Sequence, residues 1–214
     1  MRSIRLTVLW TSDMLFTLEV NELSMLDFIH HLPHGLANFF LFFSHFECVI
    51  PIILLGLVFR PQVFFQTACL VLIDIVVNVA LKGTFKVPLS PILNKIGYAF
   101  PSGHMQFATV FYGWLAFNFS WPWLRVIIFV LLFGIGCGLI HYDYHNFLDV
   151  TAGIIFGLLL IYLFYVSQAI WFWLLFASFC MLYNAFVYTE IPMHAQIAYD
   201  LFVIITTMKR AEKK

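Results

Sequence analysis

Six long apolar runs, separated by short polar segments, most constrain what this 214-residue chain can fold into. A helix needs about 20 predominantly apolar residues to cross the hydrocarbon core of a bilayer. Charged residues make up only 10% of the chain, against about 25% in a soluble domain. The sequence therefore predicts an all-α integral membrane bundle of six transmembrane helices and excludes a large extramembrane domain. The runs cover residues 36–59, 64–82, 103–120, 123–140, 150–167 and 169–188.

The segments that flank the six runs are expected to lie at the membrane surface. Residues 13–33 place Leu15, Leu18 and Leu26 near one helical stripe, which predicts an amphipathic helix in the interface. A solvated helix packed on the protein is the alternative. Near the C-terminus, a short apolar stretch before four basic residues predicts an interfacial end. The predicted parts are an N-terminal segment 1–35, a six-helix domain 36–188 and a basic tail 189–214.

Net charge and the positions of the cysteines limit which partners and cofactors the sequence predicts. Eleven basic and eleven acidic residues leave no net charge, so nothing favours a nucleic-acid partner. The cysteines form no CxxC pair and have no histidine at ligand spacing, so buried, inert thiols are expected. The sequence thus predicts lipid surroundings and neither a metal nor a cofactor. The cysteines are Cys48, Cys69, Cys137 and Cys180.

Polar residues inside a transmembrane run are costly and need partners. Asp74, Asn78 and Lys82 follow one another at intervals of four residues and so share one helical face. That face leads to the polar loop 83–102. Lys82 is a candidate to hold an anion there, positioned by Asp74 or Asn78. An internal ion pair that only joins helices is the alternative.

A second polar pattern precedes the third apolar run. In Pro101-Ser102-Gly103-His104, proline and glycine bend the backbone and serine is a helix-start residue. The free N–H groups of the first helical turn would then face the loop and favour an anion, while the histidine can give or take a proton. A structural turn with a capping histidine is the alternative.

A third pattern opens the fifth run. His145 and Asp149 share a helical face, so the carboxylate can fix the imidazole tautomer and leave the other nitrogen as a nucleophile or base. With six alternating spans, the loops 83–102 and 141–149 emerge on one membrane face, where the three patterns can meet. A capping aspartate beside an unrelated histidine is the alternative.

Together these patterns resemble the type 2 phosphatidic acid phosphatase superfamily, also called the lipid phosphate phosphatases. That family is marked by the motifs Lys-x6-Arg-Pro, Pro-Ser-Gly-His and Ser-Arg-x5-His-x3-Asp. Their order, spacing and positions relative to the spans agree here over about residues 36–188.

The resemblance implies roles for the matching residues. His145 would attack phosphorus and form a phosphohistidine, Asp149 would orient it, and His104 would protonate the leaving oxygen. No metal is required by this scheme, and the implied partner is a lipid phosphate. The residues that would hold phosphate oxygens are Lys82, Ser102 and Gly103.

Both phosphate-clamping arginines of the family pattern are absent. Leu89 and Ser90 stand where the first motif has Arg-Pro, and Gly138-Leu139 stands where the third has Ser-Arg. Because a hydrogen bond to a charged group contributes about 1.5–3 kcal/mol, losing two corresponds to a rate loss of roughly 10²–10⁴.

Three interpretations follow from this loss. In the first, Lys86 and His141, which lie in the right loops, replace the missing charges. In the second, the substrate is a phosphodiester with less charge on phosphorus, as for the sphingomyelin synthases, which the sequence also distantly resembles. In the third, the protein is a catalytically weak homologue that binds lipids or partners. The main hypothesis is a membrane enzyme that hydrolyses a lipid-linked phosphomonoester or pyrophosphate through a phosphohistidine.

The sequence is ambiguous about which membrane face holds this site. Under six spans, most basic residues fall on the predicted active face and only Arg60 and Arg125 lie opposite. The positive-inside rule then places the active face in the cytoplasm. The resemblance implies the periplasmic, lumenal or extracellular face, and this is the expectation adopted.

Overall fold

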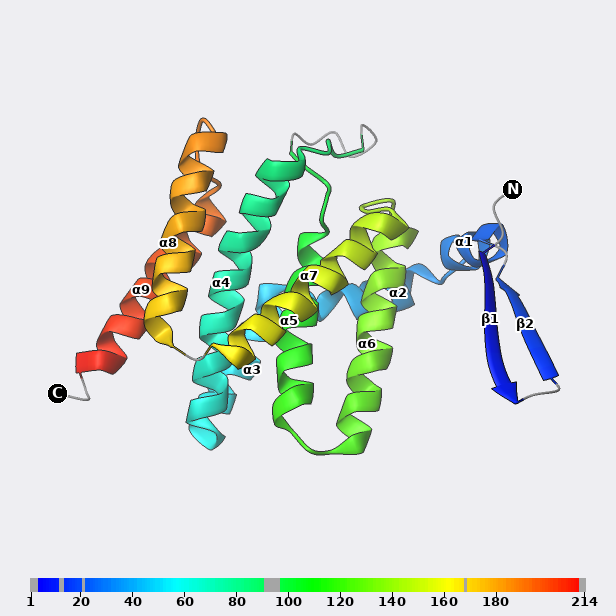
Figure 1. Cartoon of the computed structure of the whole chain (residues 1–214), viewed down its shortest axis with the longest axis horizontal. Coiled ribbons are helices and arrows are strands. Elements are labelled where there is room, and N and C mark those ends of the chain that lie inside the picture. The colour runs from blue at the N-terminus through cyan, green and yellow to red at the C-terminus, as the bar shows by residue number, and fades with distance from the viewer. Residues whose placement is uncertain (1–3, 12–13, 21, 91–96, 168, 212–214) are drawn as a thin grey trace.

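The computed structural model describes residues 4–11, 14–20, 22–90, 97–167 and 169–211. From Glu22 onward the regular elements of this described part are helices (Figure 1). They are α1 (Glu22–His30), α2 (His34–Phe42), α3 (Phe46–Phe59), α4 (Pro61–Phe85), α5 (Gly103–Asn118), α6 (Pro122–His141), α7 (Phe147–Val166), α8 (Ile170–Val187) and α9 (Met193–Ala211).

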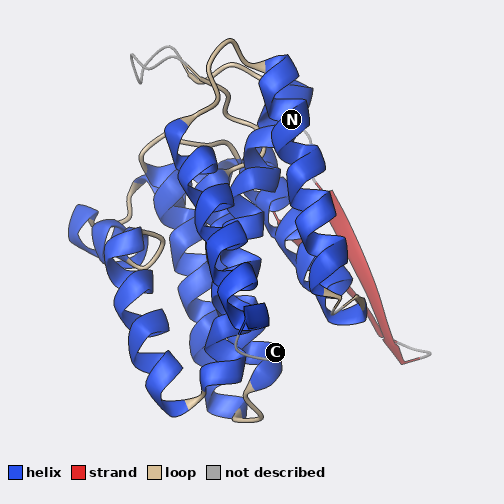
Figure 2. Cartoon of the chain, turned by 90° about the vertical axis from the view of Figure 1, so that its left-hand side faces the viewer, coloured by secondary structure: helices blue, strands red, loops and turns tan. Residues whose placement is uncertain are grey.

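A two-stranded antiparallel hairpin precedes the first helix. It consists of β1 (Ile4–Thr11) and β2 (Met14–Val20), and Figure 2 shows it outside the helical bundle. The single amphipathic helix predicted over residues 13–33 is therefore replaced by a strand in its first half, and α1 is only nine residues long. Both strand segments contain β-branched and aromatic residues, which favour strands. Because the two strands pair, the backbone N–H and C=O groups along their shared edge form hydrogen bonds with each other.

The helices α4, α6, α7 and α8 are long and apolar enough to cross a membrane. The pair α2–α3, bent by 40°, meets the same criteria when taken as one span. These spans coincide with five of the six predicted runs, so the chain is a multi-pass membrane protein. The helix α5 coincides with the remaining run but has 16 residues, fewer than the about 20 of a full span. A sixth span therefore stays a prediction.

Close packing of α5 against α7 forms the middle of the bundle. Gly153 and Gly157 lie one turn apart on α7, and a Cβ atom at Gly153 would come within 2.8 Å of the Ser102 carbonyl oxygen. Such small residues let two membrane helices approach at backbone distance. This approach brings the first turns of α5 and α7 together, which is where two of the predicted motifs lie.

The C-terminal segment is a packed helix. The sequence predicted a basic interfacial tail over residues 189–214, but α9 extends over 19 residues and packs against α4 and α8. His194, near its start, lines a cavity with Lys82, and Lys209, near its end, lies 3.6 Å above the ring of Phe65. The helix α9 therefore contacts α4 near both of its ends.

Candidate active site

Four helix ends meet at one end of the bundle. The last turn of α4 carries Lys82, α5 begins after its N-cap Ser102, α6 ends at His141, and α7 begins after the N-cap Asn146. The Ser102 backbone N–H donates to the Asp149 carbonyl oxygen at 3.0 Å, which joins the starts of α5 and α7 directly.

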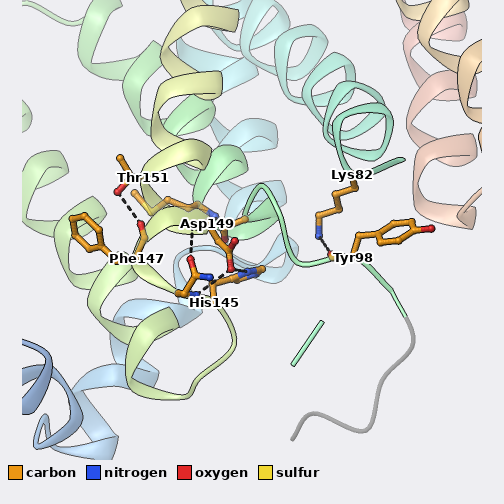
Figure 3. A network of polar contacts seen from close by, with 9 residues as sticks. Lys82, Tyr98, His145, Phe147, Asp149 and Thr151 are labelled. Atoms are coloured by element: carbon orange, nitrogen blue, oxygen red, sulfur yellow. Dashed lines mark hydrogen bonds and ion pairs between the residues drawn. The ribbon is translucent and has the colours of Figure 1, made fainter. Parts of the chain in front are cut away.

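The start of α7 holds His145 next to a fixed carboxylate. Asn146 and Asp149 form a capping box, with the Asp149 N–H donating to Asn146 Oδ1 at 2.8 Å and the Asn146 N–H donating to Asp149 Oδ2 at 3.1 Å. The same Oδ2 lies 3.5 Å from His145 Nδ1 (Figure 3). This contact is longer than a full hydrogen bond, as catalytic contacts often are before substrate binds. Asp149 thus caps its helix and also faces the histidine.

His145 is buried, and its surroundings favour the neutral imidazole. Burial, together with the nearby charges of Lys82 and His104, lowers the pKa of His145 to about 3. A neutral imidazole keeps a lone pair on one ring nitrogen and can therefore act as a nucleophile or base. Because Nδ1 faces Asp149, the nitrogen available for this chemistry is Nε2.

A buried polar network joins α4 to α5 beneath this end of the bundle. Gln106 Nε2 donates to Asp74 Oδ1 at 2.8 Å, and Asn78 Nδ2 donates to Gln106 Oε1 at 2.9 Å. The amide of Gln106 thus connects the two polar residues of the α4 face. Sequence reasoning predicted a supporting role for Asp74 and Asn78 but missed Gln106, which lies two residues after the Pro-Ser-Gly-His motif.

A cavity of about 410 Å³ opens between α3, α4, α5 and α9. It brings together predicted site residues from α4 and α5 with side chains that sequence reasoning did not assign to the site. The predicted group is Asp74, Asn78, Lys82, Gly103 and His104, and the unassigned group includes His45, Glu47 and His194.

A neighbouring cavity of about 760 Å³ shares Asn78, Lys82 and His194 with the first. Tyr98 and Tyr188 contribute aromatic walls, and Lys82 Nζ donates to the Tyr98 carbonyl oxygen at 3.0 Å (Figure 3). Lys82 therefore stands where the two cavities meet. His194, on α9, lines both cavities with Lys82. Because it is far in sequence from all three motifs, the sequence did not indicate that it lies there.

Three predicted phosphate-binding residues, Ser102, His141 and Lys86, line neither of these cavities. His141 is buried, with Nδ1 3.0 Å from the Ile29 carbonyl oxygen and Nε2 3.0 Å from His34 Nδ1, so it joins α6 to the N-terminal helices. Lys86 is exposed and ends α4 in the left-handed conformation, with φ 51°.

The positions of the missing arginines are apolar. Leu139 is buried in the core, and a Cβ atom at Gly138 would lie 3.2 Å from the carbonyl oxygen of Ala37 on α2. Leu89 lies against Gly97 in the loop after α4. Among the described residues, no group of three or more His, Cys, Asp or Glu side chains is arranged to hold a metal ion.

The fold and this end of the bundle define a helical membrane protein that gathers histidine, lysine and carboxylate side chains from different helices at one end. A model of the PAP2 superfamily matches residues 60–173, more than half of the chain. The chain therefore belongs to the PAP2 superfamily, as the sequence motifs indicated. The crystal structure of Aquifex aeolicus LpxE has the same fold, with a TM-score of 0.57 at 19% identity, covering 68% of this chain and 94% of that one. A comparison with curated proteins gives no match.

Proposed function

We propose that this protein hydrolyses a lipid-linked phosphomonoester or pyrophosphate through a phosphohistidine at His145. Its superfamily and fold support a lipid phosphatase. The observation that carries the mechanism is the pair His145–Asp149, 3.5 Å apart, beside Lys82 and His104. These groups combine a neutral nucleophile, an orienting carboxylate, an acid–base residue and a lysine.

The reaction proceeds in two steps. The lone pair of His145 Nε2 attacks phosphorus while the bond to the lipid oxygen breaks and His104 donates a proton to that oxygen. Water then attacks the phosphohistidine, giving a proton to His104, and His145 is released with inorganic phosphate. Asp149 stabilises the positive charge on the imidazole during both steps.

Lys82 and the first turn of α5 hold the phosphate oxygens in this scheme. The Lys82 ammonium exchanges the Tyr98 carbonyl oxygen for a phosphate oxygen, which is a charge-assisted and therefore stronger acceptor. Gly103 and the first turn of α5, which begins after Ser102, provide the helix N-terminus that suits an anion.

Phosphate release from defined lipids tests this function. Purified protein in detergent is incubated with phosphatidic acid, with a polyprenyl pyrophosphate and with a doubly labelled phosphodiester lipid. We expect inorganic phosphate from the first two and none from the third. Release no faster than from heat-inactivated protein, on all three lipids, contradicts the proposal.

One observation favours a second candidate, a phosphodiester head-group transferase. Lys82 is the one lysine or arginine among the described residues that line the two cavities, which suits the single negative charge of a phosphodiester. Tyr98 and Tyr188, with ring centroids 6.1 Å apart, offer aromatic faces for a cationic head group. Transfer of the labelled head group to an acceptor lipid, without free phosphate, would support this candidate over hydrolysis.

We infer a phosphate-binding role for His194 because it accompanies Lys82 in both cavities. The variant His194→Gln is expected to weaken inhibition by inorganic phosphate by about three- to tenfold, the value of one hydrogen bond. The inhibition constant measures this directly. Gln196→Ala, an exposed change on the same helix outside both cavities, is the control. An unchanged constant for His194→Gln assigns the residue a structural role.

We also infer that α9 crosses the membrane and leaves the active site outside the cytoplasm. A helix of 19 residues is about 28 Å long, close to the about 30 Å of a hydrocarbon core. It is less apolar than the spans α4, α6, α7 and α8, and its packing against α4 and α8 covers one of its faces. The basic residues around its end then join Arg60 and Arg125 on the face opposite His145. The positive-inside rule places that face in the cytoplasm. The residues around the end of α9 are Lys209, Arg210, Lys213 and Lys214.

Cysteine labelling in sealed vesicles tests this topology. Ser90→Cys precedes the second motif, and Glu212→Cys follows α9. A membrane-impermeant maleimide is expected to label the first from outside intact cells and the second only after lysis. The unmodified chain gives the background from its own thiols. Labelling of both positions from the same side contradicts a membrane-crossing α9.

A further inference from the structure

A third cavity, of about 330 Å³, lies at the end of the bundle opposite His145. It opens between the first turns of α4 and α8 and the last turns of α7 and α9. Phe164, Ile170 and Leu174 give it an apolar wall, while Gln66 and Lys209 stand on its lining as polar groups. The proposed phosphatase mechanism uses none of these residues.

The charge of Lys209 is uncompensated by any described carboxylate in this cavity. Its ammonium lies 3.6 Å above the ring of Phe65, a cation–π contact that holds the side chain in place. No Asp or Glu is among the lining residues. The cavity therefore presents a positioned cation next to apolar walls, which is complementary to an anion attached to a hydrocarbon chain.

The remaining polar groups of the lining identify a second donor. The hydroxyls of Thr206 and Thr207 donate to carbonyl oxygens within α9, at 2.7 Å to Phe202 and 2.8 Å to Val203. The part-buried amide of Gln66 has no such partner in the described part of the chain. Gln66 on α4 and Lys209 on α9 thus provide two donors, one from each helix, on the same cavity.

We propose that this cavity binds one anionic phospholipid, with its phosphate between Lys209 and Gln66 and an acyl chain along Phe164, Ile170 and Leu174. Basic pockets between membrane helices are suited to such head groups. A free anion would gain nothing from the apolar wall, and a zwitterionic lipid would leave the charge of Lys209 less well balanced. Trp171 also lines the cavity, and tryptophan is enriched at the membrane interface, where the lipid phosphates lie.

Native mass spectrometry of the full chain in neutral detergent tests the site. Titration with phosphatidylglycerol is expected to show one bound lipid at concentrations where phosphatidylcholine does not bind. Lys209→Gln and Gln66→Leu are expected to weaken that binding, the former by about tenfold because it removes a charged donor. Lys209→Arg retains a cation and is expected to keep most of the affinity. This variant shows whether Lys209→Gln weakens binding by removing the charge or by misfolding the protein.

The matched control is Arg125→Gln, which removes an exposed cation from the start of α6 at the same end of the bundle but outside the cavity. It is expected to leave phosphatidylglycerol binding unchanged. Equal affinity for the two lipids, or an equal loss in Arg125→Gln and Lys209→Gln, overturns the site. Displacement of the lipid by millimolar inorganic phosphate would point to a soluble anion and equally overturns the lipid assignment. None of these outcomes depends on whether the protein is a phosphatase.

Discussion

Replacing His145 by glutamine is expected to lower kcat for phosphate release by about 10⁴-fold or more, because the variant lacks the nucleophile of the first step. Glutamine is similar in size and polarity, so the start of α7 and its Asn146–Asp149 capping box should persist. The KM for the lipid phosphate is expected to change little, since Lys82 and the α5 N-terminus remain. Steady-state assays with phosphatidic acid measure both constants.

A trapping experiment makes this prediction specific to covalent catalysis. Wild-type protein mixed with ³²P-labelled lipid and quenched in alkali is expected to retain labelled phosphohistidine, and His145→Gln to retain none. His31→Gln is the control, since His31 is exposed and its Nδ1 lies 2.7 Å from the Asp27 carbonyl oxygen within its own segment, away from the proposed site. Turnover by His145→Gln within tenfold of wild type is incompatible with a phosphohistidine at this position.

The pH dependence of the same assay follows from the environment of His145. Burial lowers its pKa to about 3, so the imidazole is neutral, and competent as a nucleophile, at any pH well above that value. Protonation would remove the lone pair only as the pH falls towards 3. A decline of kcat between neutral pH and about pH 5 would therefore report on the leaving-group proton or the substrate phosphate and not on the nucleophile.

The membrane spans were predictable because their signal is local. A run such as residues 123–140 contains enough consecutive apolar residues to require lipid, and α6 covers Pro122–His141. The family was also predictable, since Lys82, Pro-Ser-Gly-His and the His145–Asp149 spacing carry the pattern. The break between α2 and α3 was not predicted, because Ser44 and His45 fall inside an apolar run, residues 36–59, that is long enough to be a single span.

Contacts between segments that are distant in sequence were harder to predict. The interaction of Gln106 with Asp74 depends on how α4 and α5 are rotated about their axes, and the sequence alone does not determine those rotations. The helix α9 was underestimated because Asp200 interrupts its apolar pattern; packing against α4 and α8 provides what continuous hydrophobicity would otherwise provide. His194 became a site residue only through that packing.

The packing around the third motif also bears on its missing arginine. Leu139, at the position of the family arginine, is buried in the hydrophobic core, so a long cationic side chain there would be surrounded by apolar residues. Gly138, at the position of the family serine, lies against Ala37 and Leu41 of α2. His141, predicted as a replacement, instead holds α6 to the N-terminal helices. The cavity with Lys82 gains additional titratable groups, His45, Glu47 and His194, from the start of α3 and from α9, outside the residues that match the PAP2 model.

The network beneath the site carries the second large expected effect. Gln106→Leu removes two hydrogen bonds. Asp74 Oδ1 loses the donor Gln106 Nε2, which lies 2.8 Å away, and Asn78 Nδ2 loses the acceptor Gln106 Oε1, which lies 2.9 Å away. A neutral hydrogen bond between membrane helices averages about 0.6 kcal/mol, but a buried carboxylate left without its partner costs about 3 kcal/mol or more. We therefore expect the unfolding equilibrium constant to rise by about 10²-fold, measured by reversible denaturation in mixed micelles.

Two comparisons show whether the stability loss in Gln106→Leu comes from a buried carboxylate without its donor or only from the loss of one hydrogen bond. The double variant Asp74→Leu/Gln106→Leu is expected to be more stable than Gln106→Leu alone, because it no longer buries a carboxylate without its donor. The loss of the acceptor of Asn78 is common to both variants and cancels in the comparison. Ser178→Ala removes a neutral contact between α8 and α9, from Ser178 Oγ to Tyr199 at 2.9 Å, and should cost only about 0.6 kcal/mol. If Gln106→Leu costs no more than Ser178→Ala, the network is not what holds α4 in register with α5. Lys82 and the first turn of α5 would then have to be positioned by the apolar packing around them.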